Sequence, residues 1–348
     1  EVSYIVEHSG AEVLLIDPEL KEDLADINVK HLFVLGEESD HLFENTNTPK
    51  TWTPDENATA TINYTSGTTA RPKGVEMTHR NLWLNAAIFG WQTGVDHREV
   101  YLHTLPMFHC NGWGMPYAIT GMGGKHIVLR KVDGSEILKR IKEHHVTLLC
   151  GAPAVIASIL EAANEWEGEI PGTGTMRIVV AGAPPPTKTI ERVETELGWE
   201  FIQIYGLTET APFVTMNRTR PEWDSKTAQE RAVLLSSAGS PALGIGVSTS
   251  PDGELLVRGN HVLKSYWEQP EATEQALADG WFHTGDGATL GRDHYVTITD
   301  RKKDVIISGG ENISSIEVED VLFSHPSVAE VAVIGVPDEK WGETVKAL

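Results

Sequence analysis

Short apolar runs alternate with helically spaced apolar residues along the first two thirds of the chain. The runs, which are typical of buried strands, lie at 12–16, 31–35, 146–150, 177–181 and 200–204. Helical periodicity over 135–145 and again over 187–197 separates some of them. Because strands that alternate with helices normally pair in parallel, the pattern predicts an α/β fold whose parallel sheets are covered by helices.

The texture changes after about residue 250, where shorter strand-like runs are separated by Gly and Asp turns. The runs at 254–258 and 295–299 favour a small antiparallel β part of the same large domain. A dense charge run follows at 300–304. Beyond it, a helix over 315–323 and a strand over 328–335 indicate a small α+β unit.

Both ends of the chain fall inside apparent structural elements. The chain opens on a helical pattern already in progress and stops just after an apparent strand and turn. We therefore expect a large domain without its N-terminal part (1–299), a hinge (300–304) and the start of a truncated small domain (305–348).

Composition limits the partners. The chain has 348 residues, 40% of them hydrophobic, which is enough for a large core. Its 28 basic and 50 acidic residues give a net charge of −22, which disfavours nucleic acid and anionic membrane over most of the surface. An anionic substrate must therefore be bound by a local group of residues. Peripheral membrane association and a homodimer stay open.

Cysteines and apolar runs set the expected compartment. The two cysteines, Cys110 and Cys150, form no CxxC motif and have no metal-ligand spacing, so a disulfide framework and a zinc site are not expected. No apolar run approaches the roughly 20 residues of a membrane span, and no signal peptide pattern opens the chain. A reduced, cytoplasmic setting fits these features best.

A loop rich in Gly, Ser and Thr is the first candidate for chemistry. The string YTSGTTARPKGV at 64–75 combines hydroxyls, glycines and Lys73, which together can wrap a polyphosphate. It differs from the common nucleotide loop GxxxxGK[ST], because Pro72 precedes the lysine and Gly74 stands where Ser or Thr would hold Mg²⁺. On composition alone, an ordinary surface loop is the simpler interpretation.

Five segments in order resemble the adenylate-forming superfamily, which includes acyl-CoA synthetases, coumarate-CoA ligases, peptide-synthetase adenylation domains and firefly luciferase. They are YTSGTTARPKGV (64–75), PMFHCNGW (106–113), YGLTET (205–210), GWFHTGD (280–286) and DRKKDVIISGGEN (300–312). The resemblance covers essentially the whole chain and is nearest to bacterial medium- to long-chain fatty acyl-CoA synthetases. One small departure is Ala70, where glycine is usual.

The resemblance implies a role for each motif residue in binding ATP. Lys73 and the loop hydroxyls would hold the β- and γ-phosphates, Tyr205 would face adenine, and Thr208 would meet the α-phosphate. Glu209 would bind Mg²⁺ as a hard oxygen ligand, and Asp286, joined by Arg301, would bind the ribose. The implied ATP site is Thr65, Ser66, Gly67, Thr68, Thr69, Lys73, Gly182, Ala183, Pro184, Tyr205, Gly206, Thr208, Asp286 and Arg301, with Thr65, Lys73, Thr208 and Glu209 catalytic.

Simpler interpretations stand beside these roles. An isolated Glu209 would be a surface or capping acid, Asp286 a turn residue, and 182–184 an ordinary turn after a strand. His109, Trp113 and Val214 would line the acyl pocket, while Phe108 and Met115 could be plain core. Lys303 would be the hinge pivot within a solvated charge run. The segment Ser308, Gly309 and Gly310 would meet the pantetheine arm of CoA.

The activity that the resemblance implies is a ligase of fatty acid and lipid metabolism. A carboxylate attacks the α-phosphate of ATP, pyrophosphate leaves, and CoA then takes the acyl group as a thioester. Transfer to a carrier-protein pantetheine, or a non-catalytic nucleotide- or acyl-binding fragment, are the alternatives. The superfamily's C-terminal Pro-x-x-x-x-Gly-Lys segment does not follow 340–343, so the fragment is expected to adenylate weakly.

Overall fold

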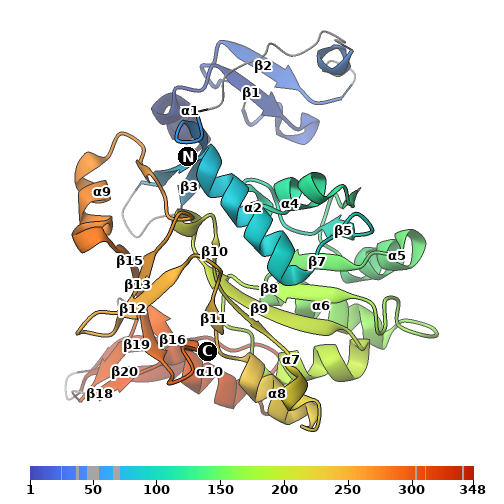
Figure 1. Ribbon diagram of the computed structural model, residues 1–348, viewed down its shortest axis with the longest axis vertical. Coiled ribbons are helices and arrows are strands. Elements are labelled where there is room, and N and C mark those ends of the chain that lie inside the picture. The colour runs from blue at the N-terminus through green and yellow to red at the C-terminus, as the bar shows by residue number, and fades with distance from the viewer. Residues whose placement is uncertain are drawn as a thin grey trace.

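The computed structural model describes residues 1–24, 26–36, 39–44, 55–65, 71–301, 304–309, 311–338 and 341–348. A seven-stranded sheet in the order β11-β10-β9-β8-β7-β5-β6 forms the centre of the large domain (Figure 1). Its strands are β5 Val100–His103, β6 Lys125–Val128, β7 Leu148–Gly151, β8 Arg177–Val180, β9 Glu200–Gly206, β10 Phe213–Arg218 and β11 Ser240–Pro241. Strands β5 to β9 run parallel; β10 pairs antiparallel with β9, and β11 pairs antiparallel with β10.

Helices cover both faces of this sheet. They are α2 His79–Thr93, α3 Cys110–Trp113, α4 Met115–Met122, α5 Gly134–His144, α6 Pro153–Asn164, α7 Thr187–Arg192 with a π turn Val193–Leu197, and α8 Ala228–Leu235. Successive strand residues point to opposite faces. Tyr101 packs in the apolar cluster below α2 and α4, whereas Leu102 packs with α5 and α6. Because both faces are covered, the sequences of these strands are continuous apolar runs, as is typical of parallel strands.

Two further sheets and several single turns complete the large domain. The three-stranded sheet holds β3 Thr59–Thr65, β4 Lys73–Thr78 and β14 Ser265–Tyr266. The antiparallel sheet holds β12 Gly246–Thr249, β13 Glu254–Arg258, β15 Phe282–Leu290 and β16 Val296–Arg301. Helix α9 spans Pro270–Ala276, and 3-10 turns lie at Pro18–Leu20, Asp40–Phe43, Thr208–Thr210, Pro221–Trp223 and Ala278–Gly280.

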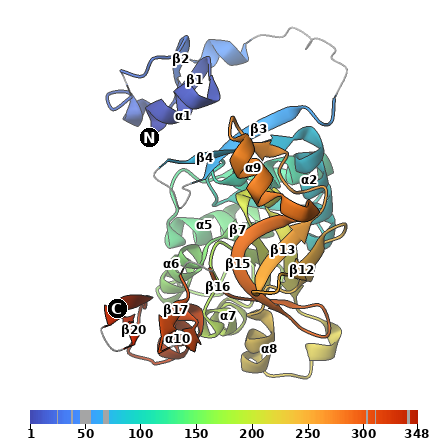
Figure 2. The same ribbon diagram turned by 90° about the vertical axis from the view of Figure 1, so that its left-hand side faces the viewer.

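The N-terminal segment forms helix α1 Val2–Ser9 and a parallel pair of strands, β1 Val13–Ile16 and β2 His31–Val34. Helix α1 contacts the β3–β4 hairpin, where His8 Nδ1 lies 2.8 Å from the hydroxyl of Tyr64. Figure 2 shows β1 and β2 at the opposite end of the molecule from the small C-terminal domain.

The small domain contains an antiparallel sheet in the order β18-β17-β20-β19, packed beside one helix. Its elements are β17 Ile306–Ser308, β18 Glu311–Ile313, α10 Ser315–Phe323, β19 Val333–Asp338 and β20 Gly342–Ala347. The α/β fold class is confirmed: a large domain with a parallel sheet precedes a small domain of antiparallel strands. The strand predicted at 328–335 is displaced, because Val328 N still bonds to the carbonyl of His325 in a turn.

Hydrogen bonds join the small domain to the large one at two places. Thr187 donates from its backbone N and its Oγ1 to Asp320 Oδ1 of α10, both at 2.9 Å. Ser315 donates from N and Oγ to Asp300 Oδ2, also at 2.9 Å. Asp300 is buried, so the expectation of a fully solvated charge run was wrong at its first residue.

Among the residues that the structure describes, no helix is both long enough and apolar enough to cross a bilayer.

Candidate active site

The candidate residues gather where parallel strands of the central sheet end. The segment that contains His109 follows β5, residues 182–184 follow β8, and Tyr205 to Glu209 close β9. In open α/β sheets this carboxyl edge is where ligands bind. The geometry therefore unites segments that lie up to 100 residues apart in the sequence.

Tyr205 and Asp286 form the best defined pair at this edge. The Tyr205 hydroxyl donates to Asp286 Oδ2 at 2.6 Å. Arg301 lies opposite Asp286 in the β15–β16 ladder, with Nε 3.9 Å from Oδ1. Burial raises the pKa of Asp286, and the Tyr205 hydrogen bond and the Arg301 charge oppose that rise. Asp286, which the resemblance assigns to the ribose, thus lies beside Arg301 and also beside Tyr205, the residue expected to face adenine.

Glu209 lies in a second group with Lys73 and Tyr266. The Tyr266 hydroxyl donates to Glu209 Oε1 at 2.8 Å, and Lys73 Nζ lies 4.8 Å from the centroid of the Tyr266 ring. Strand pairing brings them together, because β14 pairs with β4 and the backbone N of Leu263 donates to the carbonyl of Glu209 at 2.7 Å. Burial raises the pKa of Glu209, while the Tyr266 hydrogen bond and the Lys73 charge lower it.

Tyr266 was not among the residues predicted from the sequence. It lies in a two-residue strand and belongs to none of the five motifs. A single aromatic residue between Ser265 and Trp267 gives no local sign of a partner 57 positions away.

The structure describes only the ends of the candidate phosphate loop. Thr65 and Lys73 face each other as the last pair of the β3–β4 hairpin. Ser66, Gly67, Thr68 and Thr69 lie outside the described residues. The hairpin therefore places Lys73, at its end, beside Tyr266.

The position of Gly206 has no room for a side chain. A Cβ at this position would lie 1.6 Å from the carbonyl oxygen of Pro212. The close approach brings the end of β9 against the start of β10, next to Thr208 and Glu209. Residues Gly182, Ala183 and Pro184 are exposed in the neighbouring loop.

We expect Gly206→Ala to destabilise the fold by at least about 1–3 kcal/mol, because the methyl group must displace backbone. Thermal melting measures this change. Gly121→Ala is the control, since no atom lies within 4 Å of its would-be Cβ in α4. That substitution should be neutral or stabilising by up to about 1 kcal/mol. Equal melting temperatures for the two variants would contradict the steric argument.

The predicted acyl-pocket residues differ in exposure. His109 is exposed, whereas Trp113 and Val214 are buried in one apolar cluster with Met115. Met115 is core, as expected, but Phe108 is 80% exposed, so its interpretation as core was wrong. The chain turns outward at 106–109 before it re-enters the core at Cys110.

The predicted hinge and CoA residues are described only in part. Lys303 and Gly310 fall outside the described residues. Ser308 ends β17, and the backbone N of Gly309 donates to the carbonyl of Trp341 within the small domain. Arg301 is the described residue of the charge run that approaches the site.

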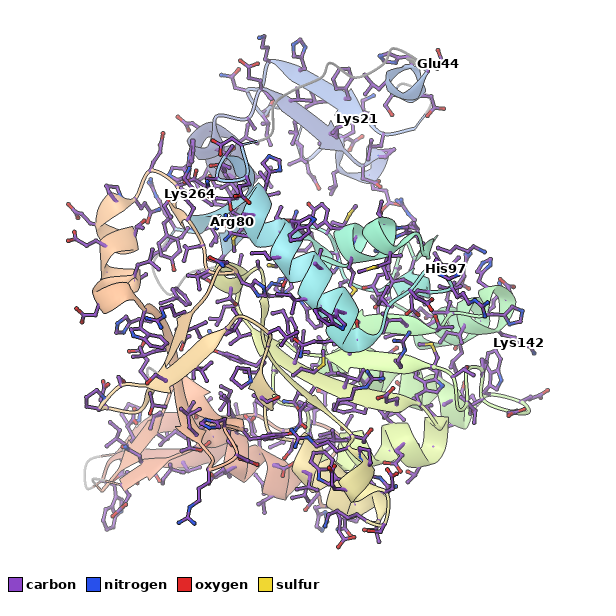
Figure 3. All side chains as sticks on the ribbon, viewed as in Figure 1. Lys21, Glu44, Arg80, His97, Lys142 and Lys264 are labelled. Carbon is purple, nitrogen blue, oxygen red and sulfur yellow. The ribbon has the colours of Figure 1, made fainter. Side chains whose placement is uncertain are left out.

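Two basic side chains near the start of α2 are paired with carboxylates. Figure 3 shows Arg80 and Lys264 near the first turn of α2. Arg80 Nη2 lies 2.6 Å from Glu56 Oε1, and Lys264 Nζ lies 2.8 Å from Glu76 Oε1. Lys73, by contrast, acts with its charge on Glu209.

Comparison with known proteins identifies the family. The AMP-binding enzyme model matches residues 1–267, and the model of the AMP-binding enzyme C-terminal domain matches residues 317–348. The chain belongs to the AMP-binding enzyme family. Membership of this adenylate-forming superfamily confirms the resemblance carried by the five motifs.

Curated AMP-binding enzymes similar to the chain include plant CoA ligases. A 2-methylpropanoate–CoA ligase from Humulus lupulus is 45% identical over 300 residues, covering 81% of this chain and 53% of the relative. A peroxisomal trans-cinnamate:CoA ligase from Petunia hybrida is 40% identical over 312 residues, covering 85% of this chain and 54% of the relative. The chain thus spans about half the length of these curated relatives.

Solved AMP-binding enzymes share the fold over the whole chain. O-succinylbenzoate CoA synthetase from Bacillus subtilis, in complex with its acyl-adenylate intermediate, gives a TM-score of 0.83 at 32% identity, covering 99% of this chain and 70% of the other. ATP-bound MatB from Rhodopseudomonas palustris gives a TM-score of 0.86 at 27% identity, covering 100% of this chain and 70% of the other.

Proposed function

We propose that the protein is an AMP-forming acyl-CoA ligase that activates an apolar carboxylic acid, in the first instance a fatty acid. The observation that carries the proposal is the placement of two groups at one sheet edge. Tyr205 and Asp286 suit the adenosine part of ATP, and Glu209, Lys73 and Tyr266 suit its phosphates and a cation.

Adenylation is a substitution at the α-phosphorus of ATP, in which the acid replaces pyrophosphate. A carboxylate oxygen of the acid forms the new P–O bond, and the bond to the β-phosphate oxygen breaks as pyrophosphate leaves. Charge on phosphate must be stabilised more than a proton must be moved. We assign Lys73, Thr65 and the loop hydroxyls to the leaving pyrophosphate and Thr208 to the α-phosphate.

Glu209 fits a magnesium role. Mg²⁺ is typically bound through one or two carboxylates together with substrate phosphates and water, so one protein acid suffices. Within the described residues, no cluster of three or more His, Cys, Asp or Glu could form an all-protein cage. Mg²⁺ would supply charge neutralisation of the phosphates, while Tyr266 orients the Glu209 carboxylate.

Thioester formation follows in the second half-reaction. The CoA sulfur forms a bond to the acyl carbonyl carbon, and the carbonyl–oxygen bond to AMP breaks. We assign Lys303 to the pivot of the small domain and Ser308, Gly309 and Gly310 to the pantetheine path. The second candidate acceptor of the acyl group is the pantetheine of a carrier protein.

The apolar character of the acid rests on the residues near the pocket. Trp113 and Val214 belong to the apolar cluster that also contains Cys110, the residue after His109. The relatives' own names range from 2-methylpropanoate to trans-cinnamate, so the substrate panel must include short, branched, long and aromatic acids. The buried free thiols of Cys110 and Cys150 support a reducing compartment such as the cytoplasm, and relatives named as peroxisomal make the peroxisome the comparison.

Two assays test the proposal. The first titrates the chain with AMP and with acyl-sulfamoyl-adenosines of different acyl groups, which mimic the adenylate without reacting. The second follows pyrophosphate release and CoA thioester formation with the acid panel. We expect saturable binding of both ligands, tighter for the acyl form, and acid-dependent pyrophosphate release. Binding of neither ligand would overturn the function; binding without pyrophosphate release would favour a non-catalytic module.

A further inference from the structure

Asn85 connects two segments of the candidate site, one that ends at Trp113 and one that leads to Phe213. It lies on α2, is fully buried, and uses both ends of its side-chain amide. Its Nδ2 donates to the carbonyl of Trp113 at 3.3 Å, and its Oδ1 accepts from the backbone N of Phe213 at 3.2 Å. A backbone carbonyl requires a donor and a backbone N–H requires an acceptor, so only one orientation of the amide satisfies both.

The first segment it holds is a left-handed turn. The φ angles of Cys110, Asn111, Gly112, Trp113 and Gly114 are 46°, 48°, 58°, 59° and 77°. Left-handed backbone is normally visited by single residues, and three of these five carry a Cβ. Such a conformation persists only where the surroundings over-determine it, and it concentrates at functional sites.

Several contacts around the turn hold it in this left-handed conformation. The backbone N of Gly114 donates to the carbonyl of Asn111, and Cys110 Sγ lies 3.9 Å from the carbonyl oxygen of Thr208. A Cβ at Gly114 would lie 2.4 Å from Asn85 Nδ2, so the turn fits directly onto the amide. The turn therefore has one docking point on α2 and another beside the nucleotide segment.

The second segment that Asn85 holds follows the Tyr205–Glu209 motif. Phe213 opens β10, and its ring stacks on Phe89, one helical turn beyond Asn85, with centroids 4.8 Å apart. Thr210 Oγ1 donates to the carbonyl of Pro212 at 2.6 Å, which ties the motif to Phe213. Helix α2 thus fixes Phe213 at both its backbone and its ring.

We propose that Asn85 is a positioning residue that sets the register between the acid segment at 109–113 and the nucleotide segment at 205–209. The acid carboxylate and the α-phosphate must meet within a few tenths of an ångström of the reactive geometry. A displacement of about 1 Å can cost on the order of 100-fold in rate. The inference rests on the proposed function, since it assigns an acid to the first segment and a nucleotide to the second.

The test compares Asn85→Ala with the wild-type chain in the same two binding titrations. Loss of the bridge should leave AMP affinity within about 2-fold and reduce the extra affinity of the acyl-sulfamoyl-adenosine by about 10-fold or more. In turnover, the acid KM should rise and kcat should fall, while the ATP KM stays constant. Asn85→Asp keeps the Phe213 contact but faces the Trp113 carbonyl with an oxygen, so it serves if the alanine variant does not fold.

Asn217→Ala is the matched control. Asn217 is also fully buried, and its Nδ2 donates to the carbonyls of Leu234 and Ser237 at 2.8 and 3.0 Å, away from both segments. It should lower the melting temperature without changing the ratio of the two affinities. If Asn85 variants weaken both ligands equally, or if Asn217→Ala changes the ratio as much, the positioning role is overturned. If the wild-type chain binds neither ligand, it is the proposed function that fails.

Discussion

Replacing Glu209 by glutamine is expected to raise the melting temperature at neutral pH and to lower pyrophosphate release by roughly 10²–10³-fold, the size of losing one charge-stabilising group. Burial raises the pKa of Glu209, and the nearby Asp286 adds to the rise. A carboxyl whose pKa is higher in the folded than in the unfolded chain stabilises the fold below its unfolded pKa and loses that contribution as pH rises through the folded pKa. At neutral pH the ionised group therefore costs stability, which glutamine removes.

The pH dependence separates this explanation from a simple packing gain. Glutamine can still accept the Tyr266 hydroxyl bond, so the stabilisation should shrink as pH falls through the raised folded pKa and be absent below the unfolded pKa of about 4.3. Thermal melts of both forms without Mg²⁺ across pH 3.5–8, on the order of one melt per half unit, measure it. A variant that melts lower than wild type at neutral pH, or that keeps wild-type turnover, would contradict the expectation.

Glu76→Gln is the matched control of opposite sign. Glu76 is buried too, but hydrogen bonds from Lys264, Ser265 and Thr59 outweigh the effect of burial and lower its pKa. A lowered pKa gives stability that is present above the unfolded pKa and lost as pH falls through the folded pKa. The control should therefore melt lower than wild type at neutral pH. If both variants shift in the same direction, the carboxyl charge is not the cause.

Features that depend on local pattern were predicted well from the sequence. The strand at β13 and the helix α10 have the predicted bounds, because period and turn residues are properties of the segment itself. Tyr205 and Glu209 were singled out by the resemblance of the segment at 205–210, which directly follows an apolar strand. Since the carboxyl ends of parallel strands share one edge, fold class alone brings the nucleotide segments near one another.

Features that depend on pairing between distant segments were not predicted. Tyr266 meets Glu209 because β14 pairs with β4, whose Val75 lies opposite Tyr266 and 191 positions earlier in the chain. Asn85 reads as a polar residue in a helix until the backbone groups of Trp113 and Phe213 are placed beside it. The left-handed turn has only Gly112 and Gly114 as a hint, and the exposure of Phe108 follows from the path of that turn.

Removing Glu99 should give the largest loss of stability among the substitutions considered, about 3–5 kcal/mol, because it leaves a paired arginine buried without its partner. Glu99 is almost fully buried and accepts from Arg177 Nη2 at one carboxylate oxygen and from Thr147 Oγ1 at the other. Arg177 Nη1 also donates to the carbonyl of Thr93. These contacts join the amino ends of β5, β7 and β8, the edge of the sheet opposite the site.

Denaturant unfolding of Glu99→Ala measures the loss, and Glu196→Ala gives the surface reference. The Glu196 pair with Arg192 is an i,i+4 contact whose side chains are 39% and 32% exposed, so its removal should cost at most about 1 kcal/mol. Similar losses for the two variants would show that burial of the Glu99 pair carries no special weight.

The double variant Glu99→Leu/Arg177→Met tests why Glu99→Ala loses stability. If the cost of Glu99→Ala comes mainly from stranding Arg177, replacing both partners by apolar residues should recover most of it, because no buried charge is left. Thr147 and the carbonyl of Thr93 would still need partners, so recovery should be incomplete. Since this network lies at the amino edge, AMP affinity of the folded double variant should equal that of wild type. A loss of affinity in proportion to the loss of stability would instead show that the two edges of the sheet are energetically coupled.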